Sequence, residues 1–437
     1  MNGTAGGVAL PAQPMSRGAA RRHALRALRH PGYRAYFFAQ ALSFAGTWMQ
    51  NVAQGWLVFR LTGSSLLLGS VSFASQIPTL LLAPFAGVLA DRVPLTRMVA
   101  ATQAVLGALA LAMAVLVFTD TVSVPWILAL SVVGGIASAF DLPARQTLLV
   151  ELAGPEDLSS AIALSSTATN AARLVGPAVA GVLVATLGEG VCFLLNALTF
   201  LAPIVVALVV KPRHVRAPAH HEPPLAALRS GLRYAVQAPH TRAVLPVVAI
   251  ASFLAFPYLP MLPLFAGGVL RGGPELLGWL NVAVGIGSVA GALAVAALVD
   301  RSRLLPRLAF GLVLYGAGLV GLGLSRDAAL SLAVMPLVGF GMLSLLSSAN
   351  TVVQTDTPES MRGRVMSLYT TVLVGLFPLG AVACGAIADA IGVGPTIAFG
   401  GAATAVSGLW LWRRLPLLRA RRGGEGLPAG APVSAGT

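Results

Sequence analysis

Long apolar segments recur along the whole chain of 437 residues, and short polar or charged stretches separate them. A transmembrane α-helix needs about 20 predominantly apolar residues to cross the hydrocarbon core of a bilayer. The pattern therefore predicts an all-α membrane protein with twelve transmembrane helices. Their predicted ranges are 35–59, 66–90, 98–118, 124–143, 159–185, 190–210, 243–266, 276–299, 305–324, 328–350, 365–389 and 393–412.

One long interior break, rich in proline, histidine and arginine, separates six predicted helices from the other six. Within it, Pro224–Val236 is predicted to form a surface helix. The domain prediction has five parts: a basic N-terminal tail at 1–34, a six-helix half at 35–210, a linker at 211–242, a second six-helix half at 243–412, and a tail at 413–437.

The two halves carry similar sequence features at matching places. TGSSLLLGS precedes Asp91 in the first half and RGGPELLGW precedes Asp300 in the second. The residues after these acids, Arg92 and Arg301, are both arginines. Two repeated halves are the plan of many secondary transporters, whose substrate site lies between the halves near the bilayer midplane. The sequence therefore predicts two pseudo-symmetric halves with a site between them.

Composition agrees with a membrane protein. Charged residues make up 10% of the chain, whereas soluble domains carry about 25%, and the mean hydropathy is +0.82. The net charge of +14 comes mainly from loops on one predicted side, because only Arg60, Arg271 and Arg326 fall on the other. Positive charge collects on the cytoplasmic side of membrane proteins, so both termini are predicted to be cytoplasmic. Residues 1–16 lack the apolar core of a signal peptide, and no folded basic face indicates nucleic-acid binding.

Several classes of chemistry have no supporting motif. Cys192 and Cys384 both fall in apolar segments, and all six histidines lie in predicted cytoplasmic segments. This pattern predicts no disulfide framework, metal site or cofactor. The chain has no G-x-x-x-x-G-K-[ST] loop for ATP, and the predicted helices hold no histidine and no pair of acids for hydrolysis. An enzyme is therefore not expected.

The loop after the second predicted helix contains G-x-x-x-D-R, formed by Gly87, Asp91 and Arg92. With two six-helix halves, this motif resembles the major facilitator superfamily. The later glycine and first arginine of that motif are absent, since Pro94 and Leu95 stand there, although Arg97 supplies a base nearby. The resemblance covers roughly residues 30–412 and implies that fold.

Three further stretches narrow the resemblance. DLPARQTLL (141–149), NAARLVGPAVAG (170–181) and RGRVMSLY (362–369) are similar to the bacterial exporter branch that includes the enterobactin exporter and macrolide-efflux proteins. Gly176, Pro177 and Gly181 fit the glycine–proline pattern of the fifth helix in export-type members, which implies a role in helix packing. The resemblance also implies a bacterial cytoplasmic membrane.

The resemblance implies that Asp91 accepts bonds from a neighbouring helix N-terminus and from arginines, locking the halves on the cytoplasmic side. Simple helix capping is the alternative, and it explains Asp91 poorly because acids gain little at a helix C-terminus. The predicted conformational gate comprises Gly87, Asp91, Arg92, Arg97, Asp300 and Arg301.

Polar residues inside the predicted helices are the candidates for the transport pathway. Gln40, Thr47, Asn51 and Gln54 lie near one face of the first helix, beside Trp48. Unpaired amides in hydrocarbon are costly, so this face either bonds to other helices or forms a wall of the transport cavity.

Arg173 is the only lysine or arginine placed deep within a predicted helix, about 21 Å from its start at 1.5 Å per residue. Such residues usually face the bundle interior or a wet cavity. We expect Arg173 to bind an anionic or carbonyl-rich group of the substrate or to tune a nearby carboxylate, with purely structural hydrogen bonding as the alternative. Asp141 and Asp389 are the candidate proton carriers, and pairing of Asp141 with Arg145 is the competing interpretation.

These features predict a secondary transporter that exports amphipathic small molecules of the drug, macrolide or siderophore type, by alternating access and with proton antiport. Its partners would be the substrate, protons and the lipid bilayer, and it is expected to be a monomer. Import of a small nutrient by the same fold is the alternative function. A membrane-embedded enzyme or a lipid flippase-like factor is a further, less supported class.

Overall fold

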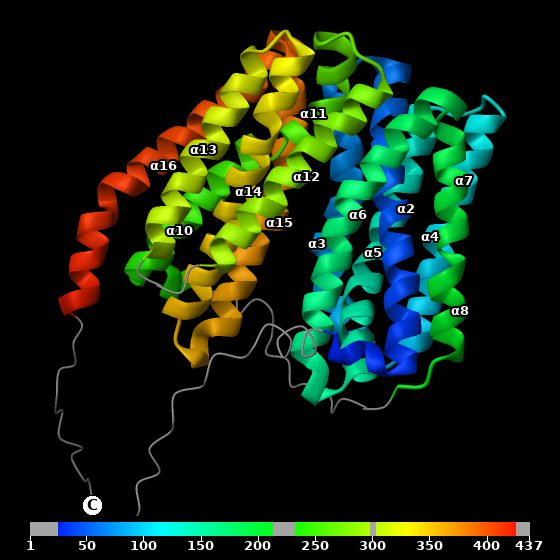
Figure 1. Ribbon diagram of the computed structural model, residues 1–437, viewed down its shortest axis with the longest axis horizontal. Helices are drawn as coiled ribbons and strands as arrows, with labels where there is room; N and C mark the ends of the chain where they lie inside the picture. Colours follow the sequence, from blue (N-terminus) through cyan, green and yellow to red (C-terminus); the bar gives the residue numbers. More distant parts are fainter. Residues whose placement is uncertain (1–24, 213–231, 298–302, 425–437) are drawn as a thin grey trace, which may run out of the picture.

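The computed structural model describes residues 25–212, 232–297 and 303–424, and regular structure in these ranges is helical (Figure 1). Asp300 and Arg301 of the predicted gate lie outside the described residues. Most of the surface helix predicted at Pro224–Val236 also lies outside them, and residues 232–237 are helical.

The N-terminal half begins with a short 3₁₀ turn, η1 (Arg26–Arg29), and continues with seven α-helices and a second 3₁₀ turn. Proline at the start of the first long helix favours initiation there, and Gly63 ends it in the left-handed conformation (φ 60°) that glycine adopts without strain. The remaining elements of this half are α2 (Pro31–Thr62), α3 (Ser65–Ala90), α4 (Leu95–Phe118), α5 (Val124–Ala153), η2 (Pro155–Asp157), α6 (Leu158–Leu187), α7 (Glu189–Thr199) and α8 (Leu201–Val209).

The C-terminal half starts with an irregular helix and continues with five long helices. The irregular helix consists of α10 (Pro239–Ile250), the π-turn η3 (Ala251–Ala255), α11 (Tyr258–Leu264) and the π-turn η4 (Phe265–Val269). The long helices are α12 (Pro274–Ala296), α13 (Leu304–Leu324), α14 (Ala328–Asp356), α15 (Glu359–Ile391) and α16 (Val393–Gly424).

The prediction of an all-α membrane fold with six helices in each half is confirmed. With α7 and α8 taken as one unit, and α10 to η4 as another, the described residues form six helical units per half. Ten of the helices in this part of the chain are long and apolar enough to cross a membrane. The other two units are α2, which carries several amides, and α16, which ends in an arginine-rich segment.

Most helices extend beyond their predicted ranges, α16 by twelve residues to Gly424, and three differ in ways that affect the site. The fourth helix, α5, continues past Pro143 to Ala153, so Asp141 and Arg145 lie inside it and not at its end. The sixth is divided at Phe200, because Pro203 has no N–H to donate to the carbonyl of Thr199 four residues earlier. The seventh contains two π-turns around a proline-rich segment, and such bulges are frequent at functional sites.

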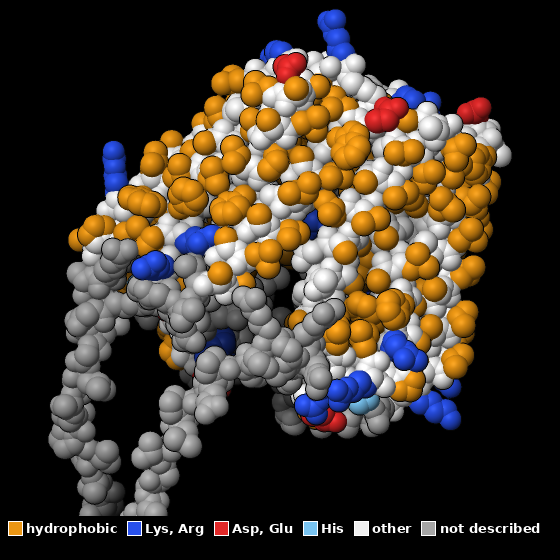
Figure 2. All heavy atoms as spheres, viewed as in Figure 1, with side chains coloured by type: hydrophobic (Ala, Val, Ile, Leu, Met, Phe, Trp, Pro, Cys, Tyr) orange, Lys and Arg blue, Asp and Glu red, His pale blue; other side chains and the backbone are white. Residues whose placement is uncertain are grey.

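The two halves stand side by side, and their contacts run mainly between α3 and α15 and between α6 and α12 (Figure 1). We call the end where α2 begins at Pro31 the basic end, and the end where α2 finishes at Thr62 the opposite end. The halves meet at the opposite end and diverge toward the basic end (Figure 1). In Figure 2, apolar side chains cover the middle of the visible face, and charged side chains gather toward its two ends.

Small residues bring helices into direct backbone contact. A Cβ on Gly69 of α3 would overlap the carbonyl oxygen of Ala381 in α15, and one on Gly278 of α12 would lie 2.9 Å from the carbonyl oxygen of Pro177 in α6. Within the C-terminal half, Gly339 meets the backbone of α12 at Val284, and Gly341 meets the backbone of α13 at Tyr315. Close backbone approach through small residues is how membrane helices pack tightly.

Candidate transport site

Close packing of α6 on α2 positions the arginine that lies deep in the fifth helix. A Cβ on Gly176 would lie 2.7 Å from the Cβ of Trp48 and 2.8 Å from the carbonyl oxygen of Ala45, so a larger residue would push the helices apart. Arg173 precedes Gly176 by about one helical turn. Gly176 therefore holds Arg173 beside Trp48.

The Arg173 guanidinium stacks on the indole of Trp48, with Cζ 5.0 Å from the ring centroid. Its Nε is buried and has no hydrogen-bond partner among the described residues. A desolvated cation–π contact is worth about 2 kcal/mol, but it does not supply an acceptor for this N–H group. The contact orients Arg173 and leaves hydrogen-bonding capacity for another group.

The C-terminal half contributes a pair of tyrosines, one of which lies close enough to Arg173 for an electrostatic interaction. That residue is Tyr258, the first of α11. The Tyr258 ring lies 6.3 Å from that of Tyr315 in α13, measured between centroids. Both tyrosines are buried, and their hydroxyls have no partner within the described residues. We call Trp48, Arg173, Tyr258 and Tyr315 the arginine–tyrosine cluster; it joins the two halves.

The chemistry of the arginine–tyrosine cluster is that of a hydrogen-bond donor site with aromatic walls. Guanidinium N–H groups and phenol O–H groups both donate, so together they suit a carbonyl, ether or anionic oxygen on an apolar molecule. Sequence reasoning missed the two tyrosines. For Tyr258, the segment FPYLPMLPLF contained a usable signal. Pro257, Pro260 and Pro263 recur every three residues beside Tyr258, which indicates an irregular helix there.

The polar face predicted on α2 divides between two roles. Gln40 accepts a bond from Arg145 Nη1 (3.4 Å) and Gln54 donates to the Ser131 hydroxyl (3.0 Å), both toward α5. The Thr47 hydroxyl donates to the Ser43 carbonyl oxygen of its own helix (2.9 Å). Asn51 is exposed. Most of this face therefore bonds within the N-terminal half, and Asn51 is the member left open to the surroundings.

Asp141 lies at the centre of a buried polar network. It forms an ion pair with Arg145 (2.8 Å between Oδ2 and Nε) one turn along α5. From α4, the Thr102 hydroxyl (2.8 Å) and the Gln103 amide (2.9 Å) both donate to its Oδ1. The Arg145 guanidinium also lies 4.8 Å from the ring centroid of Phe44. These contacts agree with the pairing of Asp141 and Arg145 that competed with a proton-carrier role.

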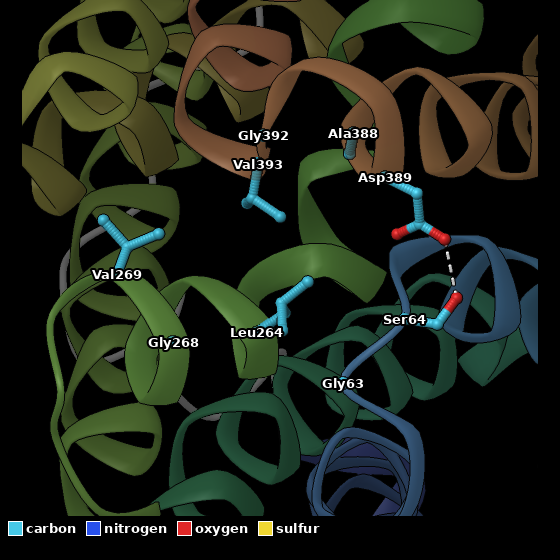
Figure 3. A pocket seen from close by; sticks show the side chains of 9 residues that line it. All are labelled: Gly63, Ser64, Leu264, Gly268, Val269, Ala388, Asp389, Gly392 and Val393. Carbon is cyan, nitrogen blue, oxygen red and sulfur yellow. Dashed lines mark hydrogen bonds between the residues drawn. The ribbon is translucent and has the colours of Figure 1, made fainter.

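Asp389 lies far from Asp141, at the opposite end of the bundle. Its carboxylate accepts bonds from the Ser64 hydroxyl (2.7 Å) and from the backbone N–H groups of Ser65 (2.6 Å) and Leu66 (3.3 Å). Figure 3 shows the side chain directed at Ser64 from the end of α15, beside a cavity of about 390 Å³. A residue of the C-terminal half therefore caps the first helix turn of α3 in the N-terminal half.

The predicted gate residues of the first half lie at the basic end. Asp91 follows the last residue of α3, and its N–H donates to the Gly87 carbonyl oxygen (3.2 Å). The side chains of Asp91, Arg92 and Arg97 are exposed, and a Cβ on Gly87 would meet no other helix within 4 Å among the described residues. In this arrangement of the halves, Gly87 is not part of a close contact between helices of the described ranges.

Two six-helix halves that meet at one end and separate at the other define a transporter of the major facilitator type. Residues 23–422 match the family described as transmembrane secretion effector. The chain belongs to this family of the major facilitator superfamily, and it is a multi-pass membrane transporter, not an enzyme.

Two relatives with known names are similar over most of their length. The multidrug efflux pump Tap of Mycolicibacterium fortuitum is 30% identical over 82% of this chain and 90% of its own. The staphyloferrin A transporter of Staphylococcus aureus (strain NCTC 8325 / PS 47) is 24% identical over 84% and 93%. The chain thus resembles both a drug pump and a siderophore transporter.

Solved structures share the fold at low sequence identity. A bacterial homologue of the human lysosomal transporter Spinster, in an inward-facing and unoccupied conformation, superposes with a TM-score of 0.66 at 14% identity, over 92% of this chain and 99% of that one. The nucleoside transporter NupG gives a TM-score of 0.67 at 13% identity, over 87% and 98%.

Proposed function

We propose that this transporter exports amphipathic small molecules from the cytoplasm by alternating access. The observation that carries the proposal is the arginine–tyrosine cluster, in which Arg173 in the middle of α6 and Tyr258 of the other half both offer hydrogen-bond donors. A ligand that bonds to Arg173 and to Tyr258 at once would couple the two halves, as a substrate must in this mechanism. The aromatic walls favour the apolar part of such a ligand.

The proposed orientation places the basic end and both termini in the cytoplasm. This follows the positive-inside rule, since only three of the 29 Lys and Arg residues lie in predicted outer loops. In that orientation the halves are closed outside and apart inside, which is the state that receives a cytoplasmic substrate. The relatives named as efflux pump and siderophore transporter support the drug or siderophore class.

We further propose that a proton gradient drives export and that Asp141 exchanges the proton. Asp141 is buried, yet it lies on the side of the N-terminal half nearer the basic end, and its carboxylate bonds to Arg145, Thr102 and Gln103. Protonation would release Arg145, whose guanidinium already reaches Gln40 on α2. A local change of charge would thereby reach the helix that carries Trp48.

Accumulation of a fluorescent amphipathic dye tests the direction and the energy source. Cells that express the transporter should hold less dye than cells that express the Arg173→Ala variant, and an uncoupler should remove the difference. Lower accumulation that survives the uncoupler would contradict proton coupling. Higher accumulation in expressing cells would show import and overturn the proposed direction.

A further inference from the structure

The bond pattern around Asp389 joins the two halves at one point. Its three bonds lead to residues 64, 65 and 66, across more than 300 positions of sequence. Two come from backbone N–H groups in the first turn of α3, which have no partner within their own helix. Asp389 thus acts as an N-cap supplied by the other half of the protein.

Asp389 lies at an end of its own helix that disfavours a carboxylate, so the bonds from α3 determine whether it is stable there. It lies in the last turn of α15, where the negative end of the helix dipole disfavours a carboxylate. The N-terminus of α3 reverses that effect, because its exposed N–H groups attract an anion. Asp389 is therefore well placed only while the opposite end is closed.

The helix pair that carries this contact is antiparallel. α3 runs from the opposite end to the basic end, and α15 runs back. At the basic end the arrangement is reversed: Asp91 ends α3, and α15 begins at Glu359. Each end of the pair thus offers one helix N-terminus and one acid from the C-terminus of the partner helix.

We propose that Asp389 is a lock for the opposite end of the transporter, and that it alternates with the lock that the family resemblance implies for Asp91 at the basic end. Closing one end caps one helix N-terminus and moves α3 and α15 apart at the other end. The two locks exclude each other because the halves that meet at one end diverge at the other. The state closed at the basic end and the state closed at the opposite end are each stabilised by one charge-assisted helix cap. Neither state is therefore favoured so strongly that the transport cycle stops.

The surroundings of Asp389 fit a lock that must open. The carboxylate is exposed and borders the cavity of Figure 3, whose lining comes from the ends of α2, α11, η4 and α16. The residues lining that cavity include no other titratable or charged side chain. Water can therefore replace the three bonds when the halves separate, and no cationic side chain of the cavity lining holds Asp389 in place.

Spin-label distances on the purified, reconstituted transporter test the lock. Labels at Thr121→Cys and Ala329→Cys lie at the opposite end on different halves, in a background with Cys192 and Cys384 replaced by alanine. Asp389→Ala and Asp389→Asn should increase the population with a long label distance about five- to tenfold, because an N-cap is worth about 1 kcal/mol or more.

Asp327 provides a matched control. It lies at the same end and caps α14, accepting a bond from Leu330 N–H (2.8 Å), but both residues belong to the C-terminal half. Asp327→Ala should leave the distance distribution unchanged. If Asp389→Ala leaves it unchanged as well, or if both variants lengthen it equally, the lock is wrong. The experiment needs no substrate, so its result is independent of the proposed export function, and Asp389→Asn keeps the side-chain volume if the alanine variant folds poorly.

Discussion

Asp141 and Arg145 stand one turn apart on α5, and their ion pair is held inside the N-terminal half by donors from α4. The same guanidinium reaches Gln40 of α2. One carboxylate is therefore connected through a single arginine to the helix that carries Trp48 of the arginine–tyrosine cluster.

Asp141→Asn should flatten the pH dependence of export while the protein still inserts and folds. Asparagine keeps the shape and accepts the Thr102 and Gln103 bonds, but it cannot exchange a proton or pair with the charge of Arg145. We expect about tenfold slower export at neutral pH, since losing a buried charged contact costs at least about 1.4 kcal/mol. Initial export rates from proteoliposomes across a pH series measure this.

Glu189→Gln is the control for that experiment. Glu189 is also a buried acid with an ion pair, to Arg60 (2.8 Å), but it lies at the start of α7 outside the network. Its variant should keep the pH dependence of the parent protein. An Asp141→Asn variant with the same pH profile as the parent would remove Asp141 as the proton site.

Arg173→Ala should abolish transport of every substrate, because it removes both the charge and the hydrogen-bond donors of the arginine–tyrosine cluster in α6. Arg173→Lys keeps the charge but loses the planar fork, so it should impair some substrates more than others. Loss of hydrogen bonds to a charged group costs about 1.5–3 kcal/mol, equivalent to roughly ten- to a hundredfold weaker binding. Binding of a fluorescent substrate to the purified variants measures the loss directly.

Arg307→Ala is the comparison for Arg173. Arg307 also stacks on an aromatic ring, with Cζ 5.9 Å from the centroid of Phe340, but it lies in the C-terminal half near the start of α13. Its removal should leave substrate binding nearly intact. Wild-type binding by Arg173→Ala would show that Arg173 is structural and would leave the cluster without its central donor.

Asp91→Asn should slow transport at least tenfold by weakening closure of the basic end, with normal membrane insertion. The label distance at the opposite end should then shorten on average, because the population moves to the state closed there. Asp120→Asn is the control: Asp120 is an exposed acid in the turn between α4 and α5, at the opposite end. Export at the parent rate by Asp91→Asn would contradict the gate.

Gly69→Ala should open the opposite end without changing any charge. The added methyl group would overlap the Ala381 carbonyl oxygen, and overpacking of a tight contact costs about 1–3 kcal/mol. Gly134→Ala is the control, since its methyl group would meet only a Leu109 methyl carbon at 3.8 Å. Label distances for the two variants should differ, and equal distances would show that the α3–α15 contact does not hold the halves together.

The number and approximate positions of the helices were predictable from the sequence, whereas the pairing of their polar residues was only partly predictable. Apolar length fixes where helices form, and the spacing of Asp141 and Arg145 places both on one helix face. The capping of α3 by Asp389 depends on the contact between halves, so no local pattern indicates it. Tyr258 was missed for a related reason, because its interaction with Arg173 depends on the contact between the halves, and an aromatic residue in an apolar segment does not indicate it.

The glycine contacts of the C-terminal half imply that the two halves do not accept mutations equally. Gly339 and Gly341 leave no room for a side chain between α12, α13 and α14, whereas α2 carries an exposed polar residue, Asn51, a short distance along the helix from its close contact with Gly176. In a random library selected for a new substrate, accepted substitutions should gather at exposed polar positions of α2 such as Asn51. The C-terminal half would then serve as the conserved frame against which substrate range diversifies.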